Sequence, residues 1–174
     1  MRLTVYTDYS LRVLIYLGTR TSRLATSREI AEYHGISNNH LLKVVHRLGA
    51  LEYIETVRGK NGGIRLARAL HEIVIGSVIR EMEYDMALVQ CKGAGAVPCR
   101  IEETCSLHPI LDEALAAFLA VLDRHTLGDL VSSFAEMRAP LEPLPSLAAQ
   151  TNADACDTCV IVTGTASGGE AMAS

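Results

Sequence analysis

The sequence contains no tryptophan, and only 5% of its 174 residues are aromatic. Its 49% hydrophobic content therefore comes mostly from alanine, leucine, valine and isoleucine, which is typical of helix-rich globular proteins. The longest uncharged apolar run, 114–122, has nine residues, whereas a transmembrane helix needs about 20. The composition excludes a chain that is disordered throughout, and the short apolar runs exclude a membrane-spanning protein.

The sequence also lacks a secretory signal and enzyme motifs, which limits the classes of function it can have. No apolar run of signal-peptide length precedes Asp8, so we expect no secretory signal and a reducing, cytoplasmic setting. Five cysteines in such a setting favour metal ligands or redox thiols over structural disulfides. The sequence has no glycine-rich nucleotide-binding loop and no cysteine beside a convincing general base, which argues against an enzyme.

The charge is divided unevenly along the chain. Residues 1–68 contain 11 lysines and arginines against 5 aspartates and glutamates, whereas residues 69–174 contain 5 against 15. A phosphate backbone responds to the local charge rather than to the net charge of the protein. The basic half is therefore predicted to bind a polyanion, with a chance distribution of surface charge as the alternative.

The first 50 residues predict three helices, over 7–19, 27–34 and 38–50. Gly35 separates the second from the third, where a residue in the left-handed conformation permits a sharp turn. At about 100° per residue, one side of the third helix is apolar: Leu41, Val44, Val45 and Leu48. The opposite side is polar or cationic: Asn39, His40, Lys43, His46 and Arg47. This pattern predicts a helix-turn-helix with a recognition helix, and an ordinary amphipathic helix pair is the alternative.

Two segments of strand composition follow, 53–57 and 64–67, separated by RGKNGG. Asn61-Gly62 in that connection predicts a tight hairpin turn with positive φ. The hairpin would form a wing with three cationic side chains near its tip: Arg58, Lys60 and Arg65. The predicted fold class is therefore mainly α with a β-wing, namely a winged helix-turn-helix domain plus a long dimerisation helix.

The chain is predicted to have four parts: a DNA-binding domain at 1–83, a cysteine loop at 84–106, a dimerisation helix at 107–134, and a mostly disordered tail at 135–174. The first part ends in a helix at 73–83. The long helix is predicted over 107–130 because four apolar side chains and a histidine recur there at spacings of four, three, four and three: Leu111, Leu115, Phe118, Leu122 and His125. Such a seam requires a partner helix, either in a second subunit or in the same chain.

The cysteine loop contains Cys91, Cys99 and Cys105, with seven and five residues between them. Thiolates favour zinc, copper(I) and iron-sulfur clusters, and a structural zinc or four-iron site needs a fourth ligand. The loop has no close C-x-x-C pair, which favours a cluster over zinc. The candidates for the fourth ligand are another subunit and, in this chain, His108, Glu102, Glu103 and the tail cysteines Cys156 and Cys159.

Three segments resemble a known family: TDYSLRVLIYL, VRGKNGGIRL, and the cysteine loop followed by a long helix. They are similar to the iron-sulfur winged-helix regulators, a family that includes IscR, over about residues 1–132, and most similar to its branch of nitric-oxide-sensing repressors. The resemblance implies a 4Fe-4S cluster on the three loop cysteines, with Asp8 of the partner subunit as the fourth ligand. Arg12 lies one turn after Asp8 and is expected to pair with it, either in support of that ligand or as a simple surface ion pair.

The expected protein is a homodimeric, sequence-specific repressor that releases its palindromic operator DNA when nitric oxide nitrosylates the cluster. Base and phosphate contacts are expected from the recognition helix and the wing: Asn39, His40, Lys43, Arg47, Arg58, Lys60 and Arg65. A 2Fe-2S cluster is the alternative cofactor. Three other functions stay open: a regulator of iron-sulfur supply or redox state, a zinc-stabilised DNA-binding module, and a thiol-disulfide oxidoreductase that uses Cys156 and Cys159 of a CDTC motif.

Overall fold

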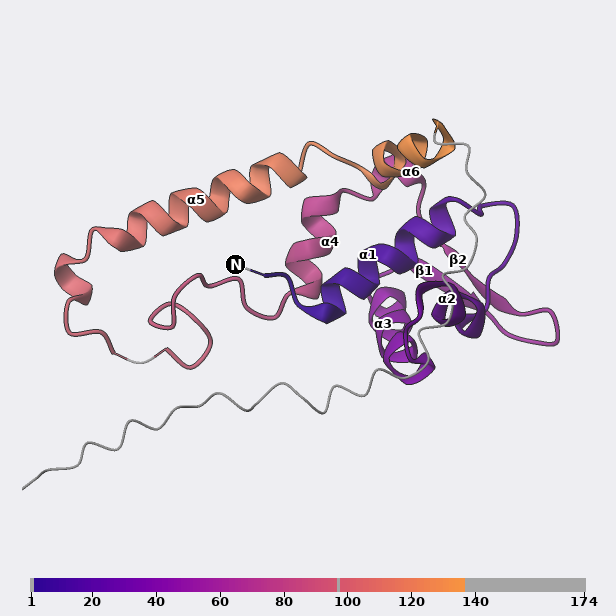
Figure 1. Cartoon of the computed structure of the whole chain (residues 1–174), viewed down its shortest axis with the longest axis horizontal. Coiled ribbons are helices and arrows are strands. Elements are labelled where there is room, and N and C mark those ends of the chain that lie inside the picture. Colours follow the sequence, from indigo (N-terminus) through magenta and orange to yellow (C-terminus); the bar gives the residue numbers. More distant parts are fainter. Residues whose placement is uncertain (1, 97, 137–174) are drawn as a thin grey trace, which may run out of the picture.

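The computed structural model describes residues 2–96 and 98–136. Six α-helices, two short 3-10 helices and a two-stranded sheet make up this part of the chain. Figure 1 shows one end of the molecule formed by the first three helices and the hairpin, with α5 extending away from it. The predicted tail lies outside the described residues except at its start, as do Cys156 and Cys159.

The first three helices confirm the predicted helix-turn-helix. They are α1 (Val5–Gly18), α2 (Ser27–His34) and α3 (Asn38–Ala50). Each begins at a hydroxyl that accepts a hydrogen bond from a backbone N–H of the first turn, which satisfies one of the free donors of a helix start. The caps are Thr4, Thr26 and Ser37. Although the sequence favours Thr7 and Ser27 as helix starts, both lie inside the helices, and Thr4 and Thr26 are the caps.

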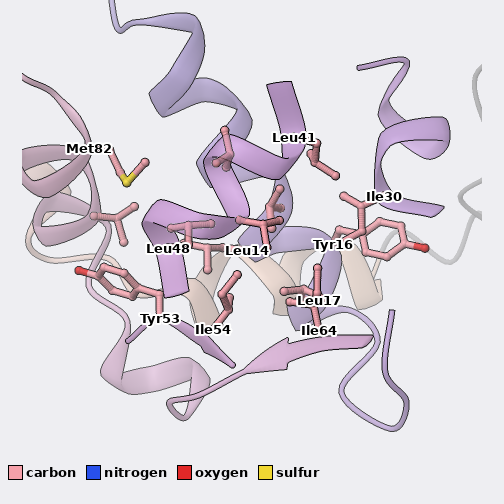
Figure 2. Packing of buried hydrophobic residues seen from close by; sticks show 14 of the residues in the cluster. Leu14, Tyr16, Leu17, Ile30, Leu41, Leu48, Tyr53, Ile54, Ile64 and Met82 are labelled. Atoms are coloured by element: carbon pink, nitrogen blue, oxygen red, sulfur yellow. The ribbon is translucent and has the colours of Figure 1, made fainter. Parts of the chain in front are cut away.

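The core lies between α1, α3 and the sheet. Figure 2 shows Leu14 of α1 beside Leu48 of α3, with Leu17 of α1 and with Ile54 and Ile64 of the hairpin in the same cluster. The four apolar residues predicted to line one side of α3 are all buried: Leu41, Val44, Val45 and Leu48. The opposite side of α3 is therefore directed away from the core.

The wing pairs β1 (Ile54–Val57) with β2 (Gly63–Leu66) in antiparallel register. The predicted tight turn at Asn61-Gly62 is wrong in detail, because the connection runs from Arg58 to Gly62 and the residue with positive φ is Gly59, at 120°. The N–H of Gly62 donates to the carbonyl of Gly59 over 3.0 Å and closes the loop. A wider loop takes the place of a two-residue turn, and the expected wing is still formed.

The predicted helix at 73–83 is α4 (Ile75–Met82), but the single helix predicted over 107–130 is divided. The first part is α5 (Leu107–Leu122). A second helix, α6 (Leu127–Glu136), begins after a break. Thr126 and Asp129 explain the break: the Thr126 N–H donates to the Asp129 carboxylate over 2.7 Å, and the Asp129 N–H donates to the Thr126 hydroxyl over 3.4 Å. This reciprocal pair is a helix start that the a/d pattern concealed.

Tertiary contacts hold the break in place. Leu127 is fully buried, and its N–H donates to the carbonyl of Ile73 over 2.8 Å. Arg80 of α4 binds Asp123, the residue that follows α5, through Nη1 and Oδ1 at 2.8 Å. Helix α6 therefore packs back on α1, while α5 has no buried residue at all. No helix in residues 2–96 or 98–136 is long and apolar enough to cross a membrane.

Candidate nucleic-acid interface and cysteine loop

A sharp turn at Gly35 presents α3 to solvent. Gly35 has φ +64° and ψ +29°, the left-handed conformation predicted from the sequence, and its N–H caps the end of α2. The next residue, Ile36, donates its N–H to the carbonyl of Ala31 over 2.9 Å and is itself buried. The Ser37 hydroxyl then caps the start of α3. The turn therefore fixes both the end of α2 and the start of α3.

The outward side of α3 is mostly polar. It consists of Asn38, Asn39, His40, Leu42, Lys43, His46, Arg47 and Ala50, all of them exposed. Three of the predicted contact residues are therefore exposed on the outward side of α3: Asn39, His40 and Lys43. Leu42 was not among the contact residues predicted from the sequence, although at 100° per residue it falls at the edge of the outward side.

Arg47 is exposed but is also bonded within the chain. Its Nη2 donates to the carbonyl of Glu81 in α4 over 3.1 Å. One turn earlier in α3, the carbonyl of Lys43 accepts a hydrogen bond from the Tyr6 hydroxyl of α1 over 2.8 Å. These two bonds connect α3 to α1 and to α4, so Arg47 helps to orient the helix. Neither contact was visible in the sequence, because each joins residues more than 30 positions apart.

The wing places its cationic side chains in two different ways. Arg58 and Lys60 are exposed in the connection between the strands. Arg65 lies further along β2 and forms an ion pair with Glu55, its cross-strand partner. Directly opposed charges of opposite sign stabilise a hairpin, so part of the charge of Arg65 is used to hold the wing together.

The cysteine loop lies at the opposite end of α4 from the wing. Cys91, Cys99 and Cys105 are free thiols, each partly exposed. The Nε2 atom of His108, near the start of α5, lies 3.1 Å from the Sγ atom of Cys91. Within the described parts of the chain, however, no three histidine, cysteine or acidic side chains come together as a metal site. Three soft thiolate donors suit an iron-sulfur cluster chemically, but the described residues of one chain do not close a ligand set around one.

Asp85 organises the first half of this loop. Its carboxylate accepts a hydrogen bond from the N–H of Ala87 over 2.8 Å and another from the N–H of Ala94 over 2.7 Å. Hydrogen bonds to the charged form lower the pKa of Asp85 below its ordinary value. The bond to Ala87, two residues on, is typical of an aspartate turn, and this was the one sequence signal for its role. Cys91 therefore lies in a segment whose two ends are joined through one carboxylate.

Asp8 lies in the first turn of α1, away from these thiols. Its Oδ2 atom pairs with the Nε atom of Arg12 at 2.9 Å, as expected from their spacing, and both side chains are about half exposed. Nearby, the Glu83 carboxylate accepts the N–H of Thr4 over 2.7 Å, which connects the start of the cysteine loop to the cap of α1. Asp8 thus has a carboxylate accessible from outside its own chain.

Comparison with known proteins assigns these features to a family. The model of the Rrf2 family, described as an iron-dependent transcriptional regulator, matches residues 3–133. The chain belongs to the Rrf2 family. A regulator named NsrR from Bacillus subtilis is 52% identical over 134 residues, which cover 76% of this chain and 92% of the relative. NsrR from Geobacillus kaustophilus is 49% identical over 143 residues, 82% of this chain and 97% of the relative.

Solved structures of the family confirm the fold. T. potens IscR matches with a TM-score of 0.65 at 20% identity, covering 80% of this chain and 93% of that chain. CymR, the global cysteine regulator of B. subtilis, matches with a TM-score of 0.61 at 23% identity, covering 76% and 98%. The protein is therefore a winged-helix transcriptional regulator of the Rrf2 family and not an enzyme, and its relatives named NsrR confirm the resemblance. The oxidoreductase alternative is not supported.

Proposed function

We propose that this Rrf2 regulator is a homodimeric, cytoplasmic repressor that senses nitric oxide through an iron-sulfur cluster, a 4Fe-4S cluster in the first instance. The observation that carries the proposal is the set of three free thiols in one loop of a chain that is 52% identical to a regulator named NsrR. Cys91, Cys99 and Cys105 would hold the cluster, and Asp8 of the partner subunit would complete the set. When bound, the cluster supplies iron that reacts with nitric oxide.

Helix α5 supports the dimer. Leu107, Ile110 and Val121 are 51%, 60% and 46% exposed, and no residue of α5 is buried. A helix with this much uncovered apolar surface is favourable only when a second surface covers it. Two subunits would read a palindromic operator with two recognition helices.

A chain of contacts runs from the cysteine loop to the recognition helix. Glu83 at the start of the loop holds Thr4 at the start of α1, and Tyr6 of the same helix holds the Lys43 carbonyl of α3. A carboxylate would be a hard ligand on thiolate-bound iron, so Asp8 of the partner subunit would be the ligand most easily replaced. Release of Asp8 of the partner subunit would free α1 of one subunit from the loop of the other, and the two recognition helices would lose their common spacing.

The proposed DNA contacts follow the exposed side chains. Asn39, His40 and Lys43 would face bases and phosphates in the major groove, and Arg58 and Lys60 of the wing would contact the flanking backbone or minor groove. Arg47 and Arg65 would contribute phosphate contacts, because a guanidinium has five N–H donors and the Glu81 carbonyl is bonded through only one nitrogen of Arg47. Arg12 would orient the Asp8 carboxylate.

The test uses the full chain purified without oxygen. Iron, zinc and acid-labile sulfide are measured per monomer, with the visible spectrum before and after nitric oxide, and affinity is measured for a duplex selected from a random library by the wild-type protein. We expect equal iron and sulfide, a sedimenting dimer, and a nitric-oxide-dependent loss of DNA affinity of roughly 5- to 150-fold, the range that a coupling of 1–3 kcal/mol produces.

Two substitutions separate the residues involved. Asp8→Ala should remove most of the nitric oxide response, whereas Glu32→Ala, which breaks an exposed i,i+4 pair with Arg28 elsewhere in the chain, should leave the response unchanged. An intact cluster whose reaction with nitric oxide leaves DNA affinity unchanged would contradict the proposal. Zinc in place of iron would instead support a zinc-stabilised module.

One observation favours a second candidate, a regulator of iron-sulfur supply or redox state. His108 lies 3.1 Å from Cys91 within the same chain, so it is a rival fourth ligand that needs no partner subunit. In that case His108→Ala, rather than Asp8→Ala, should destabilise the bound cluster. DNA affinity would then follow loss or oxidation of the cluster rather than nitric oxide.

A further inference from the structure

One apolar side chain interrupts the polar side of the recognition helix. Leu42 of α3 is 46% exposed, whereas its neighbour Leu41 is fully buried in the core. The other exposed side chains of α3 are polar or charged apart from Ala50. Almost half of Leu42 is therefore left uncovered by its own chain, and this part of its surface is available to a ligand.

Leu42 lies at one edge of the exposed side of α3, about 100° around the helix from the buried Leu41. It follows Asn39 by three residues and precedes His46 by four, so the three side chains form one stripe along the exposed side of the helix. Arg47, at the edge of the exposed side, is held towards α4 by the Glu81 carbonyl. The stripe of Asn39, Leu42 and His46 is therefore directed away from the core, with Lys43 beside it.

We propose that Leu42 determines specificity by contacting the C5-methyl group of a thymine in the major groove, an inference that rests on the proposed DNA-binding function. The C5-methyl group is the one apolar feature that a base pair presents in the major groove, and apolar side chains recognise it. A protein partner fits less well, because the surroundings of Leu42 are cationic and the segment 1–68 has 11 basic against 5 acidic residues.

The expected effect is small but specific. Removal of one buried methyl group costs about 0.8 kcal/mol, which corresponds to a roughly fourfold loss of affinity at each half-site. Two half-sites of a palindrome would together lose roughly 15-fold. Replacing thymine by uracil removes only this methyl group and leaves the hydrogen-bonding groups of the base unchanged, so the effect isolates the apolar contact.

The experiment measures affinity of the full-length protein for the duplex that wild type selects from a random library. Thymines in both half-sites are replaced by deoxyuridine one at a time, so that each duplex carries a single replacement. Binding is followed by fluorescence anisotropy. For wild type we expect one thymine per half-site whose replacement weakens binding about fourfold. Leu42→Ala should bind the unmodified duplex more weakly and be insensitive to that replacement, while Leu42→Met should restore the sensitivity.

Lys43→Ala is the matched comparison in the same helix. It should weaken binding to every duplex, because a phosphate contact carries no sequence information, and it should keep the sensitivity to uracil. If Leu42→Ala loses the same affinity on uracil replacement as wild type, the inference is wrong while the proposed function stands. If Leu42→Ala instead alters the dimer in sedimentation, a second subunit covers Leu42 and the inference is equally wrong. If wild type selects no duplex, the proposed function fails first.

Discussion

Replacing Gly35 by alanine tests the turn that directs the recognition helix. Gly35 has φ +64°, and a Cβ atom added to it would meet nothing within 4 Å. The substitution therefore introduces no clash, and its whole cost in the folded state is the strain of a left-handed L-residue, about 1–2 kcal/mol. Alanine also restricts the unfolded chain, which returns about 0.4–1 kcal/mol. We expect a net loss of about 1 kcal/mol in the free energy of unfolding.

Gly49 provides the matched control, because it lies inside α3. A Cβ atom there would meet only the Ile54 carbonyl oxygen, at 4.0 Å. Gly49→Ala removes the same unfolded-state freedom without strain, so it should stabilise the protein by about 0.5–1 kcal/mol. The effect on the unfolded chain cancels between the two variants, and the difference of about 1–2 kcal/mol measures the strain at Gly35 directly.

Urea denaturation of the full-length chain, followed by circular dichroism at 222 nm, measures this difference. With a slope of about 2 kcal/mol per molar urea, the midpoints of the two alanine variants should differ by about 0.5–1 M. Gly35→Asn should lie between them, because asparagine tolerates the left-handed region better than alanine. Equal midpoints for Gly35→Ala and Gly49→Ala would refute a strained turn at Gly35.

Two further predictions concern the cysteine loop and the start of α6. Two N–H donors lower the pKa of Asp85, so their contribution to loop stability is present above the ordinary aspartate pKa and is lost as the pH falls through the lowered one. Protection of the Ala94 amide from hydrogen exchange should therefore decrease with acid in wild type and be low at every pH in Asp85→Ala; equal protection in the two proteins would contradict this. Thr126→Ala removes the cap of α6 and should cost about 1 kcal/mol in urea denaturation, whereas the exposed Ser133→Ala should change stability by less than about 0.5 kcal/mol.

Local patterns were sufficient for the winged head of the molecule. The periodicity of 38–50 identified the four buried side chains of α3, and Gly35 marked the turn, because both signals lie within a few residues of what they determine. The candidate DNA contacts were predicted in the same way. Leu42 was missed because an apolar residue was assumed to face inward.

Long-range contacts decided the remainder. The a/d spacing of 107–130 is compatible with one long helix. The contacts of Asp123 with Arg80 and of Leu127 with Ile73 help to end α5 and turn α6 back onto α1. The Asn61-Gly62 signal was overruled by a wider loop in which Gly59 takes the positive φ.

The sequence by itself determined that this chain has a basic helix-turn-helix, a wing and three thiols in one loop. Composition, helical period and turn chemistry are local properties of a sequence. Tertiary structure decided how these parts are directed. It binds Arg47 to α4, joins the cysteine loop to α1 through Glu83, and leaves α5 uncovered. Each of these depends on which distant backbone groups and surfaces meet, and that is settled only when the whole chain packs.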